Sequence, residues 1–164
     1  MSDAQETRGT RTRRDELLRR ARETHTRLEE LLAGLPAEEQ THAGVTGDWS
    51  VKDHLAHLTW WEQSVIRTLA GEPNPIAAIP GGADGEDAIN AYVFAQNRER
   101  SLADVRAAFD ASYQAMLHLI ATAPDDVFDA RHDWISGNAD SHYDEHLRML
   151  QAWRERRSGT TGNS

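Results

Sequence analysis

Apolar residues recur at helical spacing along most of this chain, and this periodicity limits the fold more than any other feature. Between residues 13 and 33, leucine and alanine side chains fall three or four positions apart until a glycine and a proline end the segment. The same period returns over about 48–70, where Asp48 or Ser50 can cap the first turn. No stretch alternates apolar and polar residues as a half-buried strand does. The pattern therefore predicts an all-α fold.

Further helical segments and one long loop complete the pattern. Residues 72–87 are rich in proline and glycine, which predicts a loop. A short helix is expected over 87–99, and a capping box at 101–104 begins another long helix. A brief connector at Pro124 leads to the last helix, over about 138–157. Four long helices and one short one predict an antiparallel four-helix bundle with an additional short helix.

Chain length and composition limit the domain organisation and the classes of partner. With 164 residues and 38% hydrophobic content, we expect one domain over residues 13–157, with disordered tails at 1–12 and 158–164. A formal charge of -9 argues against general binding to nucleic acid, and no apolar run approaches the roughly 20 residues that cross a bilayer. The polar N-terminus has no signal-peptide core. These features predict a soluble, cytoplasmic protein.

Two histidines near the C-terminus are the strongest sign of chemistry. His142 and His146 lie about 40° apart around the last helix, on the same side as Leu147, Leu150 and Trp153. Such a pair can present two imidazoles to one metal ion, and bundle interiors often build metal sites from facing helices. A buried histidine that hydrogen-bonds a neighbour is the structural alternative. Because the chain has no cysteine, any metal site must use imidazole, carboxylate or water ligands.

A third ligand must come from another helix, and the second helix offers His54 and His57. His54 lies about 60° from the centre of that helix's apolar face and His57 about 120°, so periodicity slightly favours His54 as the inward residue. Glu62 lies within about 20° of the same centre, and a buried carboxylate needs a partner. It is either a catalytic base, an orienter of a histidine or one half of an ion pair with an arginine. Asp53 either orients His57 or is an exposed residue near the helix start.

Three motifs of the chain carry a family resemblance. They are WSVKDHLAHLTWWE at 49–62, NAYVFAQNRERSLADVRAAFDASYQAMLHLI at 90–120 and WISGNADSHYDEH at 134–146. They resemble the ClbS/DfsB family of four-helix bundle proteins, within the DinB-like superfamily, and the resemblance covers about residues 13–155. In DinB-like proteins the metal ligands are a histidine eight residues after a tryptophan of the second helix and an H-x-x-x-H or E-x-x-x-H pair in the last helix. The corresponding residues here are His57, His142 and His146.

The resemblance implies a metal-dependent enzyme that acts on a small molecule, and it also implies a homodimer. DinB-like relatives include thiol-dependent transferases and isomerases, and the ClbS/DfsB branch includes a hydrolase that protects against a reactive small molecule. Detoxification or resistance is the implied role, with zinc or nickel as the ion and a low-molecular-weight thiol as a further cofactor. Trp61, Tyr143 and Asn138 are candidate substrate contacts, although a packed core or a turn also accounts for them. The alternative is a non-catalytic bundle that sequesters a small ligand, with any metal serving structure.

Overall fold

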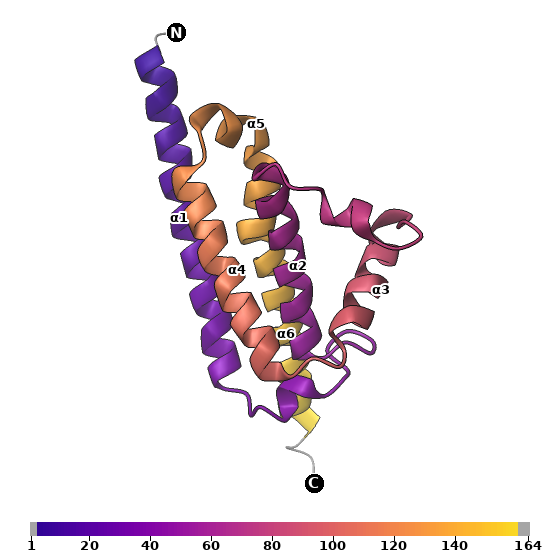
Figure 1. Cartoon of the computed structure of the whole chain (residues 1–164). Coiled ribbons are helices and arrows are strands. Elements are labelled where there is room, and N and C mark those ends of the chain that lie inside the picture. The colour runs from indigo at the N-terminus through magenta and orange to yellow at the C-terminus, as the bar shows by residue number, and fades with distance from the viewer. Residues whose placement is uncertain (1–2, 161–164) are drawn as a thin grey trace.

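Four long helices form the body of the protein (Figure 1). The structure is a computed structural model that describes residues 3–160. Its long helices are α1 (Asp3–Ala33), α2 (Val51–Leu69), α4 (Leu102–Thr122) and α6 (His142–Thr160). In Figure 1, α1 and α6 run in one direction and α2 and α4 run in the opposite direction. The predicted all-α bundle is confirmed, and no strand forms within residues 3–160.

The additional short helix α3 (Gly85–Asn97) lies outside the bundle. Because α2 and α4 run in the same direction, the chain must return along the bundle between them, and α3 makes most of that return. Helix α2 ends before Gly71, which has a positive φ of 79°. This conformation allows the backbone N–H of the next residue to donate a hydrogen bond of 2.9 Å to a carbonyl of the last helical turn. The predicted 72–87 loop follows, and it contains the 3₁₀ turn η2 (Pro75–Ala78).

A sixth helix forms where the sequence pattern predicts only a connector. This helix, α5 (Asp125–Ser136), begins directly after Pro124. Its first turn carries two aspartates, which are favourable at a helix N-terminus, and Phe128 is fully buried in the core. The π-helical turn η3 (Gly137–Ser141) then joins α5 to α6. The last helix of the bundle, α6, is therefore preceded by a helix and a π-helical turn that the periodicity does not predict.

Helix α1 includes residues 3–12, which we expected to form a disordered tail. Contacts with α5 explain the difference. The Thr10 hydroxyl donates a hydrogen bond to Asp129 at 2.5 Å, and the Arg13 guanidinium donates to the same carboxylate at 2.6 Å. Thr10 is buried by its surroundings. The start of the chain is thus ordered by a partner helix that the sequence pattern did not predict.

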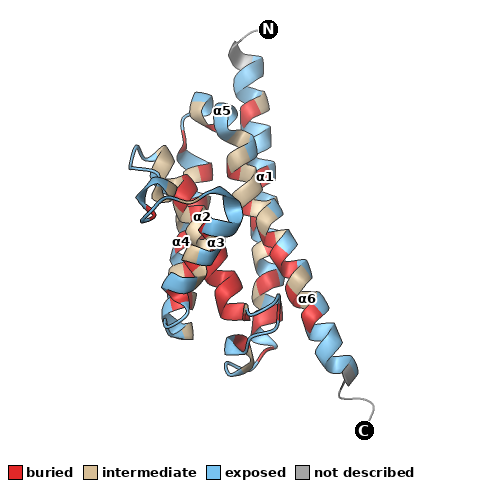
Figure 2. Cartoon of the chain, turned by 90° about the vertical axis from the view of Figure 1, so that its right-hand side faces the viewer, coloured by how far each residue is buried: buried red, intermediate tan, exposed pale blue. Residues whose placement is uncertain are grey.

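The outer ends of α1 and α6 extend beyond the bundle and are mostly exposed (Figure 2). Helix α6 continues to Thr160, past the predicted boundary at residue 157. The remainder of the two expected tails, residues 1–2 and 161–164, lies outside the described part of the chain. None of the helices in the described part has the length and hydropathy that a membrane crossing requires.

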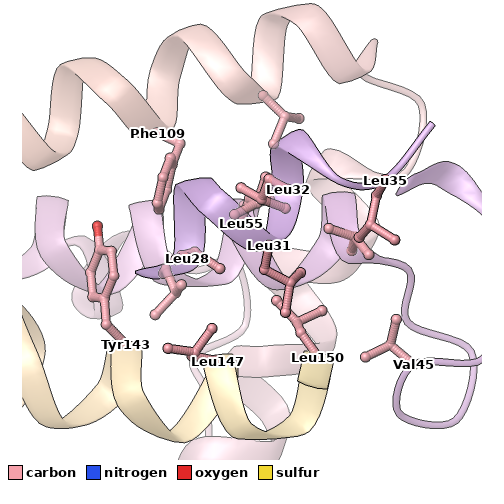
Figure 3. Packing of buried hydrophobic residues seen from close by; sticks show 14 of the residues in the cluster. Leu28, Leu31, Leu32, Leu35, Val45, Leu55, Phe109, Tyr143, Leu147 and Leu150 are labelled. Carbon is pink, nitrogen blue, oxygen red and sulfur yellow. The ribbon is translucent and has the colours of Figure 1, made fainter. Parts of the chain in front are cut away.

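Apolar side chains from all four long helices fill the bundle interior (Figure 3). Leu28 of α1, Leu55 of α2, Phe109 of α4 and Leu147 of α6 are each 0% exposed and belong to one cluster. Burial of a side chain of this kind stabilises a fold by about 1.5–3 kcal/mol. The shared cluster holds α2 and α6 in the same core, which brings their histidines together.

A reciprocal capping box begins α2. The Asp53 N–H donates to Ser50 Oγ at 3.3 Å, and the Ser50 N–H donates to the Asp53 carboxylate at 2.8 Å. Asp53 therefore stabilises the helix N-terminus, and the Nδ1 atom of His57 has no hydrogen-bond partner among the described residues. Of the two roles that the sequence left open for Asp53, the structure supports the one at the helix start, but the residue is buried and not exposed as predicted.

Lys52, the single lysine of the chain, joins the start of α2 to the end of α3. Its ammonium donates to three backbone carbonyls at 2.8–3.0 Å, those of Asn97, Arg98 and Arg100. The last carbonyls of a helix have no partner within the helix, and a cation is favourable there. Three acceptors match the three donors of the ammonium, which explains how Lys52 can be only 7% exposed.

We expect Lys52→Met to lower the free energy of unfolding by about 2–3 kcal/mol, because the carbonyls then lose a charged donor. Urea denaturation followed by circular dichroism measures the loss, and hydrogen exchange should increase most in α3. Arg11→Met, which removes an exposed cation from α1, is the control and should change stability by less than about 0.5 kcal/mol. Equal effects of the two substitutions would show that Lys52 does not anchor α3.

Candidate metal centre

The candidate site lies where α2 meets the start of α6. Helix α2 supplies His54 and His57, and α6 supplies His142 and His146. The π-helical turn η3 comes directly before α6, so that His142 is the first residue of that helix. Such turns widen a helix by one residue and are frequent at functional sites.

The imidazoles of His57, His142 and His146 turn their Nε2 atoms toward one another. His57 Nε2 lies 2.8 Å from His142 Nε2, which in turn lies 3.1 Å from His146 Nε2. Across the whole group, one ligand nitrogen of each ring lies within 4.8 Å of the others. Zinc–imidazole bonds of about 2.0–2.1 Å place neighbouring nitrogens roughly 3.3 Å apart, so the group can hold one divalent ion with little movement. The structure thus brings together the three residues that the family resemblance assigned to the metal.

Burial keeps these imidazoles neutral. Removal from water lowers the pKa of His57 to about 3 and that of His142 to about 4. The pKa of His146 is lowered for the same reason, and the neighbouring imidazoles lower it further. A neutral imidazole keeps a lone pair on one ring nitrogen, which is the form that a metal ion requires. Near neutral pH the group can accept a cation without first releasing protons.

His54 contacts the His146 ring on the side that faces away from the shared Nε2 atoms. Its Nδ1 lies 2.6 Å from His146 Nδ1, whereas His146 turns its Nε2 toward His142. His54 is 1% exposed, and burial lowers its pKa to about 4. When the Nδ1–H of His146 donates to the Nδ1 of His54, the Nε2 of His146 keeps the lone pair that a metal ion requires. The structure therefore buries both histidines of α2 and gives them different positions at the site.

A cavity of about 570 Å³ opens beside the histidines. Its size falls within the range of roughly 300–1,000 Å³ that is usual for small-molecule sites. Trp61 and Asn138, two of the three predicted substrate contacts, line it together with Glu86 and Asn90 of α3. The Trp61 indole N–H donates to Asn90 at 3.5 Å, which links the wall on α2 to the wall on α3.

Tyr143, the third predicted substrate contact, lies in the core and outside the cavity lining. It is 1% exposed and packs on Phe109 with 5.6 Å between the ring centroids (Figure 3). Its hydroxyl makes no hydrogen bond of ordinary length among the described residues, and burial, together with the nearby Glu62 carboxyl, raises its pKa well above the usual value. The placement supports the core role that the sequence left open for this residue.

Glu62, predicted as a catalytic base, also lies outside the cavity lining and is 1% exposed. Neither of its carboxylate oxygens makes a hydrogen bond of ordinary length among the described residues, and no arginine pairs with it there. Burial raises its pKa to about 7, although the nearby hydroxyls of Ser112 and Tyr143 oppose the shift. The carboxylate of Glu62 therefore lies in the bundle interior beside α4 and not in the cavity. This geometry does not support a catalytic role.

Several further residues of the cavity were not predicted as site residues, although four of them lie within the three sequence motifs. They are Thr46, Trp49, Glu86, Asn90, Trp134, Glu145 and Met149. Trp49 lies before the cap of α2, and Trp134 lies on the helix that periodicity did not predict. Only recognition of α5 and of its π-helical junction with α6 could have placed Trp134 beside the histidines.

A second group of ligand atoms occurs in the described chain, on His25, Glu29 and Asp110. The Arg106 guanidinium donates to Glu29 at 2.7 Å. His25 stacks on Tyr113, with 3.6 Å between the ring centroids. The arginine already supplies a positive charge to the carboxylate, so an ion pair and ring stacking account for this group without a metal.

Comparison with known proteins identifies the family of the chain. No curated protein and no solved structure matches it. The sequence model of the DinB superfamily matches residues 9–152, a range that includes His57, His142 and His146 and extends from α1 into α6. Since this match covers most of its length, the chain belongs to the DinB superfamily.

Proposed function

We propose that this protein is a metal-dependent enzyme that acts on a small molecule in detoxification or resistance, as a hydrolase or a thiol-dependent transferase. The observation that carries the proposal is the convergence of three neutral imidazoles beside a cavity of small-molecule size. Zinc or nickel is the proposed ion, because imidazole suits both. The likeness of the three sequence motifs to ClbS/DfsB proteins supports the detoxification role, and the relation to DinB-like proteins supports a thiol cofactor and a homodimer.

In such an enzyme, each residue of the site would have a distinct role. His57, His142 and His146 would hold the ion, and His54 would keep His146 in the tautomer that presents Nε2. A divalent ion held by these three imidazoles would keep open coordination positions, and it would supply a Lewis acid that lowers the pKa of bound water toward about 7. Asn138 offers an amide to the cavity, and the indoles exclude water from its walls.

The alternative function is a non-catalytic bundle that sequesters a small ligand, with the metal serving structure. Structural zinc sites are closed by a fourth protein ligand, whereas catalytic sites keep an open position. His54 is the fourth imidazole nearby, but its Nδ1 faces the Nδ1 of His146 and not the shared Nε2 atoms. This geometry favours an open site, and with it the enzyme.

Elemental analysis of protein purified without a histidine tag tests the proposal, and we expect about one zinc or nickel per chain. Turnover is then measured with a p-nitrophenyl ester for hydrolysis and with chlorodinitrobenzene plus a thiol for transfer. Activity that disappears with a chelator and returns with the metal supports an enzyme. Bound metal without turnover in either assay would favour the non-catalytic alternative, and absence of metal would remove the proposed centre.

A further inference from the structure

The cavity beside the histidines carries negative charge at its mouth and no positive side chain. Among the described residues that line it, the charged groups are Glu86 of α3 and Glu145 of α6, and none is lysine or arginine. Both glutamates are exposed, which places them at the entrance. The formal charge of -9 on the chain adds to the same field.

Part of the cavity wall is apolar and aromatic, beside the imidazoles and amides that also line the cavity. Trp49, Trp61, Trp134 and Met149 supply three indoles and a thioether. The rings of Trp49 and Trp61 lie close to His57, with centroid separations of 5.2 and 6.3 Å. An indole face binds flat apolar groups and attracts cations through its quadrupole. Walls and mouth together favour a molecule with an apolar body and a positive charge.

We propose that the cavity selects an amine, a small molecule with a flat or apolar body whose ammonium group lies beside Glu86 and Glu145. This inference rests on the proposed function and specifies the substrate class of the same site. A carboxylate or phosphate at the mouth would meet two negative charges and no lysine or arginine among the described lining residues, so an anionic group is disfavoured at this position. For an ammonium about 7 Å from both carboxylates in wet surroundings, the gain in affinity is roughly fivefold.

Three probes of similar shape separate the effect of charge from that of size. Phenethylamine is cationic, 2-phenylethanol is neutral and 3-phenylpropionate is anionic. Their binding to the whole chain, freed of metal by a chelator, is followed by tryptophan fluorescence, because three of the five tryptophans line the cavity. We expect the amine to bind about fivefold more tightly than the alcohol at low salt, with the carboxylate weakest and the differences smaller at high salt.

Substitution at the mouth identifies the groups responsible. In the double variant Glu86→Gln, Glu145→Gln, the affinity for the amine should fall to that for the alcohol. The control is Glu155→Gln, at an exposed position of α6 outside the cavity lining, and it should keep the preference. A carboxylate that binds as tightly as the amine, a preference that survives the double substitution, or no binding of any probe would each overturn the inference. These measurements use metal-free protein, so metal content and turnover decide the proposed function separately.

Discussion

Replacing His142 with alanine is expected to lower the affinity of the protein for zinc by more than about a hundredfold. Loss of an outer hydrogen-bond partner of a metal ligand already costs about 10- to 100-fold, and loss of a ligand should cost more. His142 is also the imidazole that the other two share, with Nε2 contacts of 2.8 Å to His57 and 3.1 Å to His146. Isothermal titration of zinc into the metal-free, tag-free protein measures the change.

The bundle should remain folded in this variant, because His142 is only half-buried and borders the cavity. Circular dichroism and thermal melting of the metal-free protein check this point. His118→Ala removes an exposed imidazole from α4 and should leave zinc affinity unchanged. If His142→Ala binds zinc as well as the wild type, the three-histidine centre is wrong. If the metal is lost while turnover continues, the ion takes no part in catalysis.

Glu62→Gln is expected to stabilise the protein by up to about 3 kcal/mol at pH 8, with little effect at pH 5. Burial raises the pKa of this carboxyl from 4.5 to about 7. The unfolded chain therefore loses the proton at lower pH than the folded protein does, so the free energy of unfolding falls as pH rises from 4.5 to about 7 and stays lower above that range. Glutamine has a similar shape and no charge, so it removes this cost.

Urea denaturation at the two pH values measures the effect of Glu62→Gln. The matched control is Glu30→Gln, which changes an exposed glutamate of α1 and should alter stability by less than about 0.5 kcal/mol at either pH. An equal stability difference at pH 5 and pH 8 would show that Glu62 does not titrate as a buried acid. Turnover of the same variant tests the catalytic role, which was one of the alternatives that the sequence left open for this buried residue.

The long helices were predictable because each one carries its own apolar face, so a local pattern suffices. The helix α5 and residues 3–12 of α1 depend on each other instead, through the hydrogen bonds of Thr10 and Arg13 to Asp129. Those partners lie 119 and 116 positions apart in the chain, and periodicity carries no information about contacts at that separation.

The candidate site, like the fold, was predictable where the signal is local to one helix and not where it depends on tertiary packing. The pairing of His142 with His146 is local to one helix, and spacing predicts it. The choice between His54 and His57 is not local, because both are buried and only the packing of α2 against α6 gives them different neighbours. The position of Glu62 around the helix predicts its depth, but whether it faces the cavity or α4 depends on tertiary packing.

The candidate centre joins opposite halves of the chain, since His57 and His142 meet across 85 positions. A fragment that ends before α6 holds one of the three imidazoles, and a fragment that starts after α2 holds the other two. Neither piece can complete the site, and a proteolytic cut that lets the halves separate destroys the centre together with the fold. A chain that is still being synthesised likewise has no complete centre until its last helix has joined the bundle.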